Sequence, residues 1–242
     1  MNLKVFDGYD QMCEEIANEI SVMLKVKPSA LLCIAAGHTS LGLLECLVRL
    51  YEEKEINFKN ASFVAMDEWL GMSEKTLGSC GEFISSNFLE KVNFEPVNIR
   101  LFDGTTSDHE TECQGVAQFI KSKSGYIDYL VLGTGMNGHL ALNEPGSDFE
   151  ACVRVVELDS TTKEVAQKYF SEDTHLSGGI TLGIGDFAKA RRSVLMVNGS
   201  HKHEILHKII AGPVSPAIPA TIITKFNNAS LYCDKKAYIG QT

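Results

Sequence analysis

Apolar and polar positions along the chain form blocks that predict helices alternating with strands. Residues 9–25 carry apolar side chains at helical spacing, and Lys27 and Pro28 end this pattern before LLCIAA (residues 31–36). That continuous apolar run is typical of a strand buried on both faces. The next segment, residues 37–56, begins with GHTS and predicts a Thr or Ser cap at the start of a long helix.

The same alternation continues toward the C-terminus. Further strands are predicted at residues 61–69, 128–133, 151–158, 192–198 and 229–234, and helices within residues 78–92 and 106–123. This order predicts an α/β fold, a three-layer αβα, Rossmann-like and mostly parallel sheet covered on both sides. The chain contains no internal repeat and no linker, so residues 1–242 are expected to form a single domain. In such a sheet the site lies at the carboxyl ends of the strands.

Composition and charge narrow the class of partner. The chain is 44% hydrophobic and 22% charged, with a formal net charge of -9 and no basic cluster with interleaved aromatics. Because an acidic surface repels phosphodiester backbones, no nucleic-acid partner is expected. The N-terminal residues carry acids where a signal peptide is apolar, and no apolar run is long enough to cross a membrane. A soluble, cytoplasmic protein without a membrane partner is expected.

The cysteines do not form a metal-binding or disulfide pattern. They are seven in number, scattered, and never spaced as CxxC. We expect no metal, and we expect the thiols to be reduced and mostly buried.

A GxGxxG pattern, Gly133 to Gly138, follows the strand predicted at residues 128–133. A dinucleotide site needs a long helix after this loop, whose N-terminus binds the pyrophosphate. Here Asn-Glu-Pro-Gly stops any helix within a few residues. We therefore prefer the interpretation that Gly135 and Gly138 shape a tight turn that brings main-chain N–H groups close to a sugar-sized ligand, without a nucleotide cofactor.

A histidine and several acids are candidates for acid–base chemistry. Glu144 follows His139 by five residues in a Pro-Gly turn, close enough to hold the imidazole in one tautomer. Taken alone, His139 could equally be a structural histidine. Asp67 and Glu68 lie near a strand end, where acids are often solvated or cap a helix. The adjacent Trp69, the only tryptophan, would shield a carboxylate and raise its pKa, which suits a general base.

The GHTS turn, residues 37–40, joins a buried strand to a long helix. Free backbone donors and two hydroxyls at a positive helix terminus bind phosphate monoesters, although an ordinary helix cap has the same sequence. Lys202 lies at a similar strand-to-helix junction and can add positive charge to the same anion. Lys163 and Lys168 are five residues apart, and any one of these lysines can equally be a solvated surface residue.

Together, several segments resemble the glucosamine-6-phosphate deaminase (isomerase) family. They are GHTS and MDEW, each after a strand, then GTGMNGHLALNEPG, GITLGIGDF and VNGSHK, in this order and over nearly the whole chain. The family loop usually reads G-x-G-x-D-G-H-I-A-F-N-E-P, and its acidic segment usually contains DEY. This chain departs at Asn137, Leu142 and Trp69. Asn137 together with DEW, SCGEF and SPAIPA is more similar to the bacterial galactosamine-6-phosphate isomerases of this family.

The resemblance implies that an aldose amino-sugar 6-phosphate becomes a ketose 6-phosphate with release of ammonia, without redox cofactor, nucleotide or metal. It implies that Asp67 moves a proton from sugar carbon 2 to carbon 1, and that His139, oriented by Glu144, opens the sugar ring. Asn137 stands where the family has an aspartate in this relay. An amide can orient a partner but cannot accept a proton, so we expect weaker or differently tuned ring opening.

The resemblance also implies which residues bind the substrate. Lys168 stands where the family has an arginine, so a bidentate grip on the phosphate becomes a point charge. The phosphate-binding and sugar-binding residues expected are Gly37, His38, Thr39, Ser40, Gly135, Gly138, Lys168 and Lys202.

Two other functions stay open at this point. One is 6-phosphogluconolactonase, a hydrolase of the same superfamily, against which the acid-bearing Asn-Glu-Pro segment and Glu144 argue. The other is a sugar-phosphate-binding regulator without turnover, which Asn137 favours and which Asp67, His139 and Glu144 oppose. Galactosamine 6-phosphate giving tagatose 6-phosphate is the expected reaction, and glucosamine 6-phosphate giving fructose 6-phosphate is the alternative. Family members occur as monomers and hexamers, so both a monomer and a homo-oligomer remain open.

Overall fold

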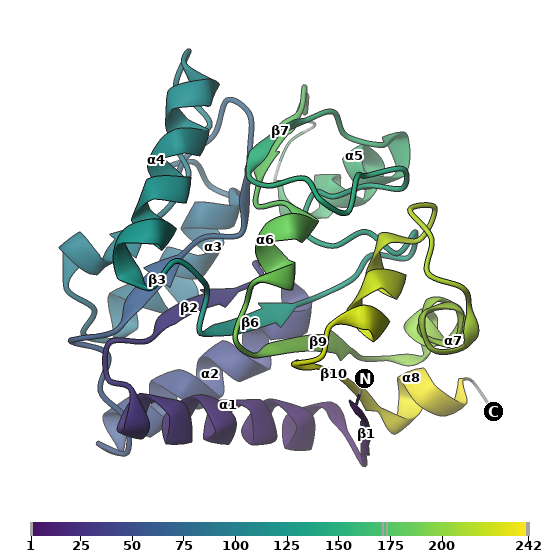
Figure 1. Ribbon diagram of the computed structural model, residues 1–242, viewed down its shortest axis with the longest axis horizontal. Coiled ribbons are helices and arrows are strands. Elements are labelled where there is room, and N and C mark those ends of the chain that lie inside the picture. The colour runs from purple at the N-terminus through teal and green to yellow at the C-terminus, as the bar shows by residue number, and fades with distance from the viewer. Residues whose placement is uncertain (1, 171, 173, 241–242) are drawn as a thin grey trace.

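The protein, seen here in a computed structural model that describes residues 2–170, 172 and 174–240, contains two sheets (Figure 1). The larger has seven parallel strands in the order β1-β10-β9-β6-β2-β3-β5. Its strands are β1 Asn2–Phe6, β2 Leu31–Ile34, β3 Ser62–Val64, β5 Ile99–Arg100, β6 Tyr129–Leu132, β9 Ser193–Val197 and β10 Ala229–Asp234. The predicted mostly parallel sheet is confirmed.

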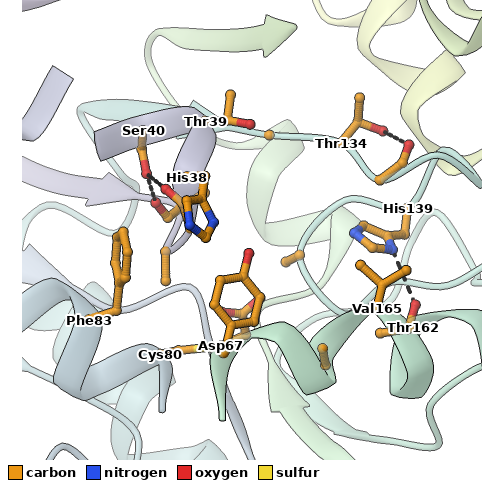
Figure 2. Close-up of a pocket in the computed structure, with 18 of the residues that line it drawn as sticks. His38, Thr39, Ser40, Asp67, Cys80, Phe83, Thr134, His139, Thr162 and Val165 are labelled. Carbon is orange, nitrogen blue, oxygen red and sulfur yellow. Dashed lines mark hydrogen bonds between the residues drawn. The ribbon is translucent and has the colours of Figure 1, made fainter. Parts of the chain in front are cut away.

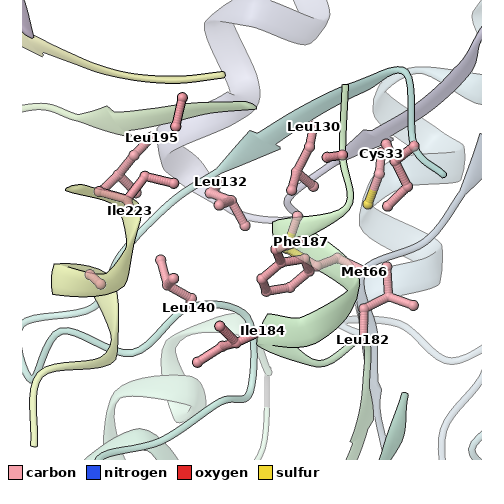
Figure 3. Close-up of a cluster of buried hydrophobic side chains, with 14 of the residues drawn as sticks. Cys33, Met66, Leu130, Leu132, Leu140, Leu182, Ile184, Phe187, Leu195 and Ile223 are labelled. Atoms are coloured by element: carbon pink, nitrogen blue, oxygen red, sulfur yellow. The ribbon is translucent and has the colours of Figure 1, made fainter. Parts of the chain in front are cut away.

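Helices cover both faces of this sheet. They are α1 Tyr9–Val26, α2 His38–Glu52, α3 Cys80–Asn87, α4 His109–Lys123, α6 Ile184–Ala188, α7 His203–Ala211 and α8 Lys235–Ile239, whereas α5 Ser160–Ala166 packs with Trp69 and Leu142 at the smaller sheet. In β2, Leu31 and Cys33 belong to a buried cluster with α4, α6, α7 and α8, whereas Leu32 and Ile34 belong to a cluster with α1, α2 and α3. Figure 3 shows the first cluster around Phe187. The continuous apolar strands of the sequence are explained by this burial on both faces.

The smaller sheet is antiparallel and has the order β4-β8-β7, with β4 Asp67–Trp69, β8 Gly179–Thr181 and β7 Arg154–Val156. Two strand predictions need correction. The run predicted as one strand, residues 61–69, breaks after Val64, and its second half leaves the parallel sheet to pair with β8. The strand predicted at residues 151–158 exists as β7 but also belongs to the smaller sheet. Each segment is apolar enough for either sheet, and only the partner strand decides between them.

The remaining differences concern short or half-exposed elements. β1, β5 and β8 were not expected, because β1 is a largely exposed edge strand and the other two have only two and three residues. The helix after the GHTS turn begins at His38, with Gly37 as its N-cap and no side-chain cap. The predicted Thr or Ser cap is therefore wrong. Short 3-10 helices complete the chain at Leu89–Lys91, Pro96–Asn98, Gln167–Tyr169, Ser200–Lys202 and Pro219–Lys225.

Among the described residues, no helix is long and apolar enough to span a bilayer. All seven cysteines are free thiols: Cys13, Cys33 and Cys233 are buried, Cys152 is exposed and the other three are half-buried. The expectation that most cysteines are buried therefore holds only for three of them.

Candidate active site

A cavity of about 600 Å³ opens where the carboxyl ends of β2, β6 and β9 meet the smaller sheet. Figure 2 shows Thr39 and Thr134 along one side of it, Asp67 and Cys80 along the opposite side, and His139 at one end. The residues predicted for the site that line it are Gly37, His38, Thr39, Ser40, Asp67, Gly135, Asn137, His139, Lys168 and Lys202. Glu144 and Gly138 do not line the cavity and lie behind these residues.

One side of the cavity, here called the lysine side, consists of residues 37–40, Lys168 and Lys202. Gly37 has φ 126°, which favours glycine, and it turns the chain from β2 into α2. No side chain caps this helix, and its first residues, His38, Thr39 and Ser40, line the cavity. The Ser40 hydroxyl donates to the carbonyls of Ala35 at 2.5 Å and Gly37 at 2.9 Å, so it braces the turn.

The two lysines of this side repel each other. Lys202 Nζ donates to the Thr134 carbonyl at 2.6 Å, and burial together with the charge of Lys168 lowers the pKa of Lys202 to about 8. Burial and the same two lysines also lower the pKa of His201. The described partner of Lys202 is a backbone carbonyl, and no carboxylate is among the described groups that shift its pKa. A bound dianion would therefore stabilise the charged form of Lys202.

Tyr9, which the sequence did not single out, fastens the turn of the lysine side from outside the cavity. Its hydroxyl donates to the Thr39 carbonyl at 3.0 Å and accepts from the Gly42 N–H at 2.8 Å. A Cβ on Gly42 would come within 2.7 Å of the Tyr9 ring, so glycine is required for this close packing. The first turn of α2 is thereby held against α1.

The opposite side, here called the carboxylate side, carries Asp67, while His139 lies at one end of the cavity with Glu144 behind it. Asp67 is 9% exposed, and burial, reinforced by the neighbouring Glu68 charge, raises its pKa from 3.8 to about 7. The nearby Cys80 side chain opposes this rise in pKa. The pKa of this carboxyl group is raised, as expected, and Trp69 is buried and lines the same cavity.

Glu68, the second acid of the DEW segment, has a different environment. Its carboxylate accepts from the backbone N–H groups of Trp69 at 2.8 Å, Cys80 at 3.0 Å and Gly81 at 2.8 Å. Cys80 and Gly81 are the first residues of α3, so Glu68 binds the N-terminus of that helix. The helix-capping interpretation therefore applies to Glu68, and Asp67 remains free to face the cavity.

The imidazole of His139 lies between the loop after β6 and α5. Its Nδ1 is 3.6 Å from Glu144 Oε2 and 3.5 Å from the Thr162 hydroxyl. A Cβ on Gly135 would come within 2.5 Å of Cε1 of this ring, so glycine there makes room for the imidazole. Asn137 donates to Glu144 Oε2 at 3.0 Å, and its own Oδ1 accepts from the His139 N–H at 3.2 Å. The predicted meeting of His139 with Glu144 is present.

Glu144 and Asp67 are shifted in opposite directions although both are largely buried. Burial raises the pKa of Glu144, but the hydrogen bonds from His139, Thr162 and Asn137 outweigh it, and the net effect lowers that pKa. Two carboxyl groups with pKa values pushed apart are the usual arrangement of a permanent anion beside a group that exchanges protons. Glu144 fits the first part and Asp67 the second.

Thr162, Cys80 and Tyr169 are cavity residues that sequence reasoning missed. Thr162 contacts His139, the Cys80 N–H donates to Glu68, and the Tyr169 ring stacks on His38 with centroids 5.5 Å apart. Thr162 and Tyr169 lie in the same segment as Lys168, and all three line the cavity. In the sequence, Lys168 alone indicated that this segment belongs to the site. Lys163, in the same segment, does not line the cavity.

The loop after β6 has no helix in the described segment 133–149. It turns through Leu140 and Asn143 instead, so the dinucleotide interpretation lacks the helix N-terminus it requires. In the described part of the chain, no group of three or more His, Cys, Asp or Glu side chains is arranged to hold a metal ion.

The family model described as glucosamine-6-phosphate isomerases/6-phosphogluconolactonase matches residues 7–232. The chain belongs to this family. Its fold and the positions of its cavity residues agree with the segments that carried the resemblance.

Proteins named glucosamine-6-phosphate deaminase are similar to this chain over nearly their full length. The glucosamine-6-phosphate deaminase of Clostridium acetobutylicum is 34% identical over 98% of both chains, and glucosamine-6-phosphate deaminase 2 of Bacillus subtilis is 31% identical over 98% of this chain and 96% of its own. A monomeric glucosamine-6-phosphate deaminase of solved structure superposes with a TM-score of 0.95 at 28% identity, covering 100% of each chain. A 6-phosphogluconolactonase from Thermotoga maritima has a TM-score of 0.73 at 18% identity, covering 96% and 97%, which shows the shared fold alone.

Three of the departures from the usual family pattern line the same cavity. Trp69, Asn137 and Leu142 all line the cavity, although Trp69 is distant in the sequence from the loop that carries the other two. Leu142 and Trp69 also share a small buried cluster under the second sheet. The departures therefore change the wall that faces a ligand.

Proposed function

We propose that the protein converts an amino-sugar 6-phosphate and water into a ketose 6-phosphate and ammonia, with galactosamine 6-phosphate as substrate and tagatose 6-phosphate as product. The observation that carries this proposal is the separation of charge in the cavity. On one side, burial and the charge of Lys168 lower the pKa of Lys202, and on the other, burial and the charge of Glu68 raise the pKa of Asp67.

A hexosamine 6-phosphate has the complementary charges. Its phosphate dianion suits the lysine side, where α2 presents an uncapped N-terminus, and its protonated amine suits the carboxylate side. A 6-phosphogluconolactone has the phosphate but no cation, so it would leave Asp67 without a counter-charge. The separation of charge therefore favours the amino sugar over the lactone.

The side chains can perform the reaction in sequence. His139, held by Glu144, moves the proton that opens the sugar ring. Asp67 then takes the proton from carbon 2, and that bonding pair forms the double bond of an enolamine as the aldehyde oxygen is protonated. Return of the proton to carbon 1 gives an imine at carbon 2, to which water adds before ammonia leaves. One water is consumed and one carbon–nitrogen bond is broken, so the net reaction is a hydrolysis.

The pKa of Asp67 suits this role. At about 7 it lets the carboxyl give and take protons near neutral pH. Asn137 cannot exchange a proton, so it serves the ring-opening step only by orienting Glu144 and the loop.

The choice of galactosamine rests on Asn137, Trp69 and the SCGEF and SPAIPA segments, which are similar to galactosamine-6-phosphate isomerases. The glucosamine alternative is supported by the names of the relatives. The two sugars differ in one hydroxyl at carbon 4, and the cavity-facing departures at Trp69, Asn137 and Leu142 are the residues most able to read it.

Ammonia release from galactosamine 6-phosphate and glucosamine 6-phosphate, measured in parallel, tests the proposal. We expect faster release from galactosamine 6-phosphate, and loss of release in Asp67→Asn. The reverse preference would keep the chemistry and change the sugar. No ammonia from either substrate would overturn the deaminase proposal, and lactone hydrolysis and sugar-phosphate binding would then be measured on the same protein.

A further inference from the structure

Tyr169 contacts two residues of the lysine side with the same aromatic ring. The ring stacks on the imidazole of His38, with centroids 5.5 Å apart and an angle of 24° between the planes. The ammonium of the neighbouring Lys168 lies 4.9 Å from the centroid of the Tyr169 ring, which is the geometry of a cation–π contact. All three residues line the cavity. One half-buried ring therefore joins the turn between β2 and α2 to a lysine of the 3-10 helix Gln167–Tyr169.

Two glycines make room for the segment that carries this ring. In the turn into α2, a Cβ on Gly37 would come within 3.2 Å of the Tyr169 hydroxyl oxygen. Just before α3, a Cβ on Gly78 would come within 2.5 Å of the Tyr169 carbonyl oxygen and 2.8 Å of the Phe170 ring. Both glycines have positive φ, 126° at Gly37 and 86° at Gly78. Tyr169 is thus packed closely against two separate turns, which fixes where its ring lies.

Lys168 needs a contact of this kind to stay beside the phosphate site. Its side chain is exposed, and the like charges of Lys168 and Lys202 repel each other. A long lysine side chain also loses rotamer freedom when it is held in one position. The face of the Tyr169 ring attracts the ammonium electrostatically and offsets part of both costs.

We propose that Tyr169 is a positioning residue for phosphate binding: its ring holds Lys168 and His38 on the lysine side of the cavity, where they face the phosphate of the substrate. The inference rests on the proposed function, which places the sugar phosphate on that side. Tyr169 acts through the two residues that its ring contacts. The ring, and not the hydroxyl, is therefore the part of Tyr169 that phosphate binding requires.

Binding of inorganic phosphate, measured by isothermal titration calorimetry at low ionic strength, tests this inference. In Tyr169→Leu we expect Kd to rise roughly fivefold to tenfold, because Lys168 and His38 lose the ring that holds them. Tyr169→Phe keeps the ring and should bind phosphate within about twofold of wild type. Tyr126→Leu is the matched control, because Lys27 lies 5.3 Å from the centroid of that tyrosine ring outside the cavity, and Kd should not change.

The conservative variant and a double variant separate a positioning role from other roles of Tyr169. An equal loss of binding in Tyr169→Leu and Tyr169→Phe would overturn the inference, because it would assign the effect to the hydroxyl. In the Lys168→Met background, Tyr169→Leu should raise Kd further by about twofold or less, since the main partner of the ring is already absent. Losses that add in full would show that Tyr169 and Lys168 act independently, and would also overturn the inference.

A pair of glycine variants disturbs the same contact from the backbone. Gly78→Ala places a Cβ within 2.5 Å of the Tyr169 carbonyl oxygen, so residues 169 and 170 must move and Kd for phosphate should rise as in Tyr169→Leu. Gly71→Ala is the matched control, because Gly71 has the same φ of 86° and a Cβ there meets nothing within 4 Å. An equal rise of Kd in both glycine variants would reflect backbone strain alone and would contradict the inference.

A measurement on the free protein tests the ring contact without any ligand. The ring current of Tyr169 shifts the NMR signals of the His38 ring protons, which are assigned by their loss in His38→Gln. These signals should move in Tyr169→Leu and stay near their wild-type positions in Tyr169→Phe. Unmoved signals in Tyr169→Leu would overturn the inference.

The phosphate titration also separates this inference from the proposed function. Weaker phosphate binding in Tyr169→Leu, with binding retained in Tyr169→Phe, supports the inference even if no ammonia is released from any sugar. Equal binding by wild type and Tyr169→Leu would overturn the inference alone. Absence of phosphate binding to the wild-type protein would overturn both the inference and the proposed function.

Discussion

The lysine side and the carboxylate side of the cavity are built from different sheets. Lys202 and the turn at residues 37–40 follow strands of the seven-stranded parallel sheet, whereas Asp67 lies in the three-stranded antiparallel sheet. On the lysine side a helix N-terminus adds positive potential to two cations. On the carboxylate side burial and a second acid surround one carboxyl group. Each side holds like charges together, and the signs are opposite.

This contrast shows how one cavity can be prepared for a dipolar ligand. Burial lowers the pKa of Lys202 to about 8 and raises that of Asp67 to about 7, so each group is close to losing its charge in the free protein. A ligand with a phosphate at one end and an amine at the other restores both charges. A ligand with one charge restores only one of them, and we propose this difference as the basis for preferring an amino sugar.

The largest expected effect comes from removing the carboxyl group of the carboxylate side. Asp67→Asn is isosteric but cannot accept a proton, so kcat/KM should fall about 10³-fold. Binding of inorganic phosphate on the lysine side should remain, as isothermal titration calorimetry would show. A comparable loss of kcat/KM and of phosphate binding would contradict the independence of the lysine side and the carboxylate side.

The same variant should be more stable than wild type at alkaline pH. The folded-state pKa of Asp67 lies above its ordinary value of 3.8, so the protonated acid favours the fold and this contribution is lost as pH rises through about 7. Asp67→Asn should therefore gain on the order of 2–4 kcal/mol in unfolding free energy at about pH 8 and little at about pH 4. Urea unfolding at both pH values measures the difference, and a pH-independent difference would contradict the shift.

A change on the lysine side should appear in KM. Lys202→Met removes the cation that the Thr134 carbonyl holds toward the cavity, so KM for a sugar 6-phosphate should rise roughly 30- to 100-fold while kcat changes less. Lys163→Met changes a lysine of the same acidic chain outside the cavity and serves as the control. A rise in KM in both variants would show only a general effect of net charge.

Displacing His139 should have an intermediate effect. Gly135→Ala places a Cβ within 2.5 Å of the imidazole Cε1, so the ring must shift and kcat should fall about tenfold or more. Gly8→Ala is the matched control, because a Cβ there meets nothing within 4 Å. Steady-state assays of both variants measure the change in kcat. A wild-type kcat in Gly135→Ala would show that His139 does not act in the rate-limiting step.

The smallest effect is expected from restoring the family aspartate. Asn137→Asp places a second carboxyl beside Glu144, whose Oε2 is 3.0 Å from the present amide nitrogen. One of the two acids then takes up a proton, and the variant should lose about 1–2 kcal/mol of stability at about pH 8 and less at about pH 5. Thermal unfolding at both pH values measures the loss. Ammonia release from both sugars then shows whether Asn137 takes part in their discrimination.

The sequence predicts most reliably those structural features that local chemistry determines. The apolar runs of β2, β6, β9 and β10 identify buried parallel strands, because the αβα layers cover both faces. In the loop after β6, the glycines and the Asn-Glu-Pro-Gly segment stop a helix from forming, because their backbone preferences act locally. The nucleotide-binding helix is excluded in this way. Most of the predicted site residues also line the cavity, since loops at the carboxyl ends of parallel strands meet at one edge.

Prediction from the sequence fails where the structure of a segment depends on which distant segment it pairs with. The run at residues 61–69 reads as one strand, yet Met66 already accepts a hydrogen bond from Leu182 of the second sheet, and the strand partner changes there. Thr162, Cys80 and Tyr9 reach the site through contacts between distant elements, so their spacing in the sequence carries no signal.

By itself, the sequence determined the layered parallel architecture, the position of the loop that carries His139 and Glu144, and the candidate residues Asp67, His139 and Glu144, because hydrophobic period, glycine and proline act over a few residues. Only the tertiary structure decided that Glu68 binds a helix terminus while Asp67 faces the cavity, and that Asp67 and Glu144 titrate in opposite directions. Two adjacent acids have the same intrinsic chemistry. Their burial and hydrogen-bond partners, which come from elements distant in the chain, make them different.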